Sequence, residues 1–270
     1  MSPGPWSHVQ DAPSGTLEDL LLRIQRAAVP VQPLGGGWWR RWSRRLRALG
    51  QPIRRTPTLA DALPCLLPKV RTQAEHEAYV KDGGRAAPCC RPLAGNLVVS
   101  LVAGFANQDL DLDPAQLTAW NADFDVLLQR ARTNLLARGE DRGFQPVREG
   151  CYRSGWRDGL DGSRILLPGI LRRLRVQGDP VAVLAGHDAL LVTGDRDPEG
   201  LVWALGTALA RLEGDPDARA ATPLGCRNGA WERLVLPDGH PAADLLRRLE
   251  SRARLPESRP GLKVGQVRAA

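Results

Sequence analysis

The amino-acid sequence predicts an α+β fold, with a mixed or antiparallel sheet, packed helices and an arginine-rich helical part at the N-terminus. Segments with the helical period alternate with short apolar runs rich in β-branched residues. Two pairs of these runs are separated by hairpin turn signals, at 186–188 and at Asn228–Gly229. We expect a loose segment at 1–15, a helical arginine-rich region at 16–90, an α/β domain at 91–254 and a polar tail at 255–270.

Helices are expected where a capping residue precedes apolar residues that share one face. Thr16 begins such a segment at 16–28, and Asp113 stands before Pro114 at the start of another. The same pattern predicts helices over about 121–138, over 160–176 with Asp161 as its cap, over 197–214 with Asp197 as its cap, and over 241–254. In the helix over 121–138 the apolar face consists of Phe124, Leu127, Leu128, Ala131 and Leu135.

Strands are expected at 96–106, in the paired segment 144–153, and in the hairpins 180–194 and 223–236. Prolines punctuate the segment 52–68. A short helix is expected at 71–80.

The composition is that of a basic globular protein. The chain has 270 residues, enough for one large domain or two small ones, and 43% of them are hydrophobic. The formal net charge is +7, and nearly all the cations are arginines, because Lys69, Lys81 and Lys263 are the lysines of the sequence. This balance favours an acidic partner, although a GC-rich genome would also enrich arginine.

Cysteine usage predicts a cytoplasmic protein with free thiols. The count of five is odd, no two cysteines form a C-x-x-C pair, and residues 1–15 lack the charged and then apolar pattern of a signal sequence. No apolar run approaches the roughly 18 residues that a membrane span needs, so no transmembrane segment is expected.

The stretch GGGWWRRWSRRLR at 35–47 is the strongest local signal. At about 100° per residue, residues 38–49 form an amphipathic helix with an apolar arc of Trp38, Trp39, Trp42, Leu46 and Leu49. The opposite side holds Arg40, Arg41, Arg44, Arg45 and Arg47. The tryptophans and arginines of this helix are the predicted partner-binding residues.

Several roles suit this basic helix. Its apolar arc can pack on the core, with the arginines as a solvated face. Alternatively, the arginines neutralise nucleic-acid phosphates while a tryptophan stacks on bases. The indoles also suit the headgroup region of an anionic membrane, or a groove on a partner protein. Because an indole N–H needs a hydrogen-bond partner, the three tryptophans slightly favour an interface.

Three segments resemble a known family. They are LDPAQLTAWNADFDVLLQRARTNL at 112–135, WRDGLDGSRILLPGILRRL at 156–174 and DPVAVLAGHDALLVTGDRDPEGLVWAL at 179–205. In this order they resemble the uncharacterised bacterial family catalogued as domain of unknown function 1444, over about residues 95–236. Its D-G-x-D-x-S-R-I-L element matches 158–166, with Leu160 where the family has an aromatic residue. The resemblance implies a cytoplasmic α/β protein and supplies no catalytic residues.

One polar cluster is a candidate anion site: Asp158, Asp161, Ser163 and Arg164. A helix that starts there would present free N–H groups to an anion, and Arg164 would add a bidentate contact. In the alternative arrangement Asp161 caps the helix by accepting an N–H bond from Ser163 or Arg164, and Arg164 pairs with Asp158.

Motifs of known chemistry are incomplete. The segment 195–200 imitates the start of a calcium loop, but Gly206 stands where the bidentate glutamate belongs. Cys89 and Cys90 are adjacent and lack the spacing of a zinc site. No G-x-S-x-G, P-loop or G-x-G-x-x-G pattern occurs. We therefore predict no catalytic residue, metal or cofactor.

Together these observations predict a cytoplasmic, non-catalytic binding or accessory protein. Its basic helix at 38–49 would contact an acidic partner, nucleic acid first. The alternative is an enzyme that acts on a small anionic substrate near 158–164, and a deep pocket beside that segment would favour it. A second alternative is peripheral contact with an anionic membrane.

Overall fold

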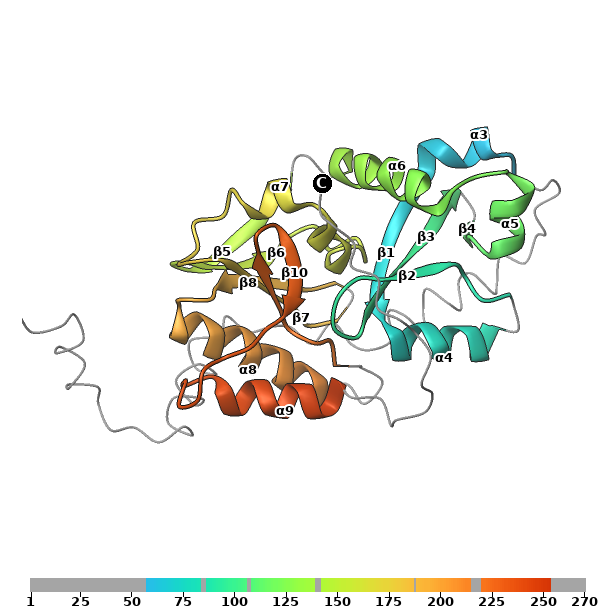
Figure 1. Ribbon diagram of the computed structural model, residues 1–270. Coiled ribbons are helices and arrows are strands. Elements are labelled where there is room, and N and C mark those ends of the chain that lie inside the picture. Colours follow the sequence, from blue (N-terminus) through green and yellow to red (C-terminus); the bar gives the residue numbers. More distant parts are fainter. Residues whose placement is uncertain are drawn as a thin grey trace, which may run out of the picture.

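The computed structural model describes residues 57–83, 86–105, 108–138, 142–186, 188–214 and 220–253. It has an α+β fold with two sheets in which every pair of strands is antiparallel, so the predicted fold class is confirmed (Figure 1). The predictions for 1–15, 16–28, 38–49 and 255–270 lie outside the described residues, and so do all eight predicted partner-binding residues.

The first sheet has four strands in the order β1-β3-β2, with β4 also paired to β3. These strands are β1 (Leu66–Thr72), β2 (Cys90–Pro92), β3 (Leu97–Phe105) and β4 (Gln108–Asp111). Helix α6 (Phe124–Ala137) packs on this sheet with the predicted face, because Phe124, Leu127, Leu128, Ala131 and Leu135 are all buried. Helix α4 (Gln73–Gly83) follows β1, and α5 (Pro114–Ala119) follows β4.

The second sheet has six strands in the order β10-β9-β7-β8-β6-β5. They are β5 (Phe144–Arg148), β6 (Cys151–Ser154), β7 (Pro180–Leu184), β8 (Leu190–Gly194), β9 (Leu224–Arg227) and β10 (Ala230–Arg233). Helices α8 (Pro198–Gly214) and α9 (Ala243–Ala253) lie side by side along one face of this sheet (Figure 1).

The central strands of the second sheet are buried on both faces. In β7, Val181 and Val183 belong to the apolar cluster with α8 and α9, whereas Ala182 and Leu184 belong to the cluster that includes Ile165, α6 and the first sheet. This division follows from the period of two in a strand, where successive side chains point to opposite faces. One apolar core therefore lies between the sheets and a second lies under the two helices.

Strand β1 is an element that the sequence prediction missed. No strand was predicted in the helical region 16–90, yet β1 begins at Leu66, after a short helix α3 (Leu59–Ala62) and a turn of 3-10 helix η1 (Leu63–Cys65). Pro68 fits because β1 is an end strand of its sheet, where a missing N–H costs no ladder bond. Strand β1 also pairs with β3, which places it in one sheet with residues beyond the expected limit at 90–91.

Several local predictions are confirmed. The Asp113 carboxylate accepts a bond of 2.7 Å from the N–H of Gln116, and Asp197 accepts one of 2.8 Å from Gly200, so each caps its helix. In the β9–β10 hairpin, Asn228 and Gly229 have φ angles of 51° and 79°. Both lie in the left-handed region that a two-residue hairpin turn requires.

The long helix predicted over 160–176 is wrong. The chain instead forms a 3-10 turn, η2 (Gly162–Leu166), and then a separate four-residue helix, α7 (Pro168–Leu171). Pro168 cannot donate to the preceding turn, and it disfavours the helical region for the residue before it. Leu167 accordingly has φ −113° and ψ 73°.

Turn η2 connects the two sheets through buried hydrogen bonds. The hydroxyl of Ser163 accepts a hydrogen bond of 3.0 Å from the N–H of Val70 in β1, which points away from β3.

A Ser163→Ala variant leaves the N–H of Val70 without its partner in the core, so we expect the free energy of unfolding to fall by about 1–3 kcal/mol. Urea denaturation measures this loss. The matched control is Ser251→Ala, which removes an exposed hydroxyl; equal stability of the two variants would contradict the role of Ser163.

Candidate functional site

The residues of the predicted anion site meet in one place, but they face inward. They belong to the junction segment, Asp158–Leu166, which connects β6 to α7 and packs against β1 and β8. Asp161, Ser163 and Arg164 are no more than 2% exposed. The segment approaches β7 closely, because a Cβ at Gly162 would lie 3.1 Å from the Leu184 side chain.

The guanidinium of Arg164 is buried and contacts several protein groups. Its two terminal nitrogens donate to the two carboxylate oxygens of Asp158, each at 2.9 Å, in a bidentate pair. One of them also donates to the backbone oxygen of Arg138 at 3.4 Å. The guanidinium carbon lies 4.1 Å from the ring centroid of Trp156, which packs edge-on against Phe144. The pairing of Arg164 with Asp158 is thus the arrangement that the structure has.

Asp161 is not a helix cap, which corrects the sequence prediction. Its side chain makes no bond to the amides of η2. One carboxylate oxygen instead accepts from the backbone N–H of Arg157 at 3.2 Å, and the Ser154 hydroxyl also hydrogen-bonds this carboxylate. The other oxygen is buried without a hydrogen-bond partner among the described residues. Arg157, which supplies this N–H, has a φ of 53°. This left-handed backbone conformation is uncommon for residues other than glycine and asparagine.

The pKa values of the two carboxyl groups, Asp158 and Asp161, are shifted in opposite directions. Burial alone would raise the pKa of Asp158, but the hydrogen bonds and charge of Arg164 outweigh it and lower that pKa below its ordinary value. Burial is the main cause that raises the pKa of Asp161, and the hydrogen bonds from Ser154 and Arg157 offset it only in part. Asp158 is therefore held as an anion, whereas the charge of Asp161 is disfavoured.

This geometry gives the junction segment a structural role. Arg164 is only 1% exposed, and its guanidinium contacts Asp158, Arg138 and Trp156. The pocket described below is lined by α7 and the β9–β10 hairpin and by none of the four predicted anion-site residues.

Substitutions in the Arg164–Asp158 ion pair test whether its two charges stabilise the fold. Asp158→Asn leaves the guanidinium of Arg164 buried without its counter-charge, and we expect a loss of about 3 kcal/mol in the free energy of unfolding. The double variant Asp158→Asn with Arg164→Met removes both charges, so it should lose less than Asp158→Asn alone. Chemical denaturation compares them. Asp244→Asn, in an exposed pair with Arg247, is the control and should cost less than about 1 kcal/mol. A double variant less stable than the single one would contradict this account.

The raised pKa of Asp161 predicts a pH dependence. Because the folded pKa lies above the ordinary value of 3.8, the folded state binds this proton more tightly than the unfolded state does. The group's contribution to stability is therefore greatest below pH 3.8 and declines as the pH rises through the folded pKa. The stability of Asp161→Asn minus that of the unsubstituted protein should thus increase from acid to neutral pH. Urea denaturation across this range measures the difference, and a decrease toward neutral pH would refute the assignment.

A second buried polar cluster was not foreseen from the sequence. Arg71 in β1 is 3% exposed; its guanidinium donates to Asp111 at 3.4 Å and lies 5.0 Å from the Tyr79 ring centroid. The Nε of Arg71 and the Nδ1 of His76 are buried without hydrogen-bond partners among the described residues. Burial, followed by the charge of Arg71, lowers the pKa of His76, so its imidazole is neutral at pH 7. The cluster fixes α4 on β1 and β4.

None of the five cysteines forms a disulfide, as expected from the sequence. Burial raises the pKa of Cys151 to about 11 and also raises the pKa of Cys226. Since the thiolate is the reactive form of cysteine, both are poor nucleophiles. Within the described ranges, no three His, Cys, Asp or Glu side chains are placed to hold a metal ion.

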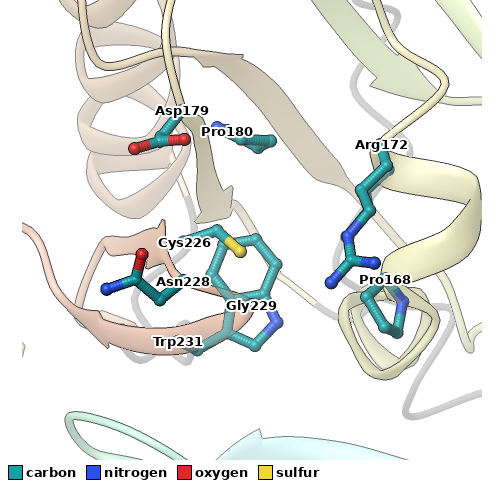
Figure 2. Close-up of a pocket in the computed structure, with 9 residues that line it drawn as sticks. Pro168, Arg172, Asp179, Pro180, Cys226, Asn228, Gly229 and Trp231 are labelled. Carbon is teal, nitrogen blue, oxygen red and sulfur yellow. The ribbon is translucent and has the colours of Figure 1, made fainter. Parts of the chain in front are cut away.

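A pocket of about 220 Å³ opens beside α7 (Figure 2). It is lined by Pro168, Leu171, Arg172, Asp179, Pro180, Cys226, Asn228, Gly229 and Trp231. The indole of Trp231 is fixed because its N–H donates to the backbone oxygen of Ile165 at 2.9 Å. No local sequence pattern indicates this pocket, because its residues come from three separate segments. The Asn228–Gly229 turn was the single local signal that pointed to part of it.

Comparison of the chain with protein-family models, with curated proteins and with solved structures gave no match. The resemblance to the domain of unknown function 1444 family therefore stays a prediction from the residues quoted above. Of the helices that the structure describes, none combines the length and apolar character needed to cross a membrane.

Proposed function

We propose that this protein is a non-catalytic binding or accessory protein that contacts nucleic acid through the basic segment 38–49. The contact residues would be Trp38, Trp39, Arg40, Arg41, Trp42, Arg44, Arg45 and Arg47. The proposal rests on how charge is divided between the described fold and the rest of the chain.

The described fold carries no net formal charge. It contains 22 of the 37 Lys and Arg residues and 22 of the 30 Asp and Glu residues, so the remaining residues hold the whole charge of +7. The segment 1–56 accounts for most of it, with Asp11, Glu18 and Asp19 against Arg23, Arg26, Arg40, Arg41, Arg44, Arg45, Arg47, Arg54 and Arg55. A compositional bias toward arginine would act on the whole chain, whereas here the unbalanced arginines are confined to particular segments.

The chemistry of the segment suits a polyanion with exposed bases. Each arginine that neutralises a phosphate releases condensed counterions, which makes the affinity fall steeply with salt. A tryptophan that stacks on an unpaired base adds about 1–3 kcal/mol. The described arginines are less suited to this role, because several are paired within the protein, such as Arg164 with Asp158 and Arg233 with Glu250.

Removing four arginines from the segment tests this proposal. We expect the variant Arg40→Ala, Arg41→Ala, Arg44→Ala and Arg45→Ala to lose binding to single-stranded and duplex DNA, measured by fluorescence anisotropy of labelled DNA. On duplex DNA the slope of log affinity against log salt should become shallower by about 3 to 4.

A charge-matched control separates a local contact from a global effect. Arg173, Arg175, Arg196 and Arg227 are exposed in the described fold, and replacing them by Ala changes the net charge by the same amount. We expect this control to bind nearly as the unsubstituted protein does. Equal losses in both variants, or no binding by the unsubstituted protein at low salt, would refute the proposal. Binding to anionic vesicles but to neither DNA would assign the segment to a membrane surface instead.

A further inference from the structure

The pocket beside α7 has an apolar floor and a polar rim. Pro168, Pro180, Cys226 and Trp231 are half-buried, and Leu171 is buried beneath them. The exposed lining residues are Arg172, Asp179 and Asn228. Small-molecule sites commonly have this form, with apolar walls and a few polar groups that orient the ligand. The volume of about 220 Å³ is below the roughly 300–1,000 Å³ of drug-sized sites, so the ligand must be small.

Two oppositely charged side chains on the rim of the pocket make no polar contact with the described part of the chain. Neither the guanidinium of Arg172 nor the carboxylate of Asp179 has a hydrogen bond or ion pair with any other residue in the described part of the chain. Figure 2 shows them on opposite sides of the Trp231 indole, with the Cys226 sulfur between them. Burial is the main cause that raises the pKa of that thiol, while the charge of Arg172 lowers it and the charge of Asp179 raises it.

The absence of a side chain at Gly229 leaves room for the guanidinium of Arg172. Gly229 has a φ of 79°, and a Cβ there would lie 3.0 Å from a terminal nitrogen of Arg172. The positive φ favours glycine at this turn position, and the guanidinium of Arg172 lies beside it. The pocket thus brings together the indole of Trp231, the guanidinium of Arg172, the carboxylate of Asp179 and the thiol of Cys226.

From this arrangement we infer that the pocket binds a small zwitterion of the α-amino-acid class. The ligand carboxylate contacts Arg172, its ammonium group contacts Asp179, and an apolar side chain lies against Trp231. A simple anion would leave Asp179 opposed by a like charge, and a simple cation would do the same at Arg172. A zwitterion complements both. This site belongs to the described fold and does not depend on the basic segment 38–49.

Free amino acids and their singly charged analogues test the inference. L-leucine, L-methionine and L-phenylalanine are offered to the full-length protein at millimolar concentration, and binding is detected by saturation-transfer NMR and calorimetry. We expect at least one to bind. For L-leucine, 4-methylpentanoate lacks the amino group and 3-methylbutylamine lacks the carboxylate; the corresponding analogues of whichever amino acid binds should be at least about ten-fold weaker, because each loses a charge-assisted contact.

Single substitutions assign the two contacts. Arg172→Gln and Asp179→Asn should each weaken binding of the amino acid by about ten-fold or more. The controls Arg173→Gln and Asp238→Asn change exposed charges outside the pocket and should leave binding unchanged. The inference is overturned if none of the three amino acids binds, if an analogue binds as tightly as its parent, or if the pocket variants behave like their controls while remaining folded.

Discussion

Buried hydrogen bonds made by the short junction segment link the two sheets of this protein. The segment lies between two antiparallel sheets, and its side chains reach both. Ser163 accepts from Val70 in β1, and Asp161 contacts Ser154 of β6, whose hydroxyl also accepts from the Leu190 amide in β8 at 2.9 Å. Each unpaired group at such a site would cost more than one ordinary hydrogen bond contributes, so the two sheets are held in one relative position.

The ion pair in this segment gives its charges a structural role. A buried guanidinium is tolerable only with a partner, and Asp158 supplies a bidentate one while Trp156 covers its face. The same segment orders the neighbouring pocket, because the backbone oxygen of Ile165 fixes the indole of Trp231. The junction segment and the adjacent pocket, with its two unpaired charges, are thus linked by a hydrogen bond.

Local chemistry in the sequence predicts much of the fold. The caps at Asp113 and Asp197, the Asn228–Gly229 turn and the apolar face of α6 depend on nearby residues, and all are present. What was missed depends on distant partners. Strand β1 contains Pro68 and is recognisable only once β3 lies beside it, and Asp161 turns from its expected capping role toward Ser154. The pocket joins α7, β7 and the β9–β10 hairpin, which no local pattern connects.

The division between a neutral fold and basic flanking segments is the basis of the proposed function. The most direct measurement compares the full chain with a shortened chain of residues 57–253 in the salt dependence of DNA binding, after circular dichroism establishes that the shortened chain is folded. This account predicts steep salt dependence for the full chain and no measurable binding by the shortened chain at about 50 mM salt. Equal affinity and equal salt dependence for the two chains would contradict it.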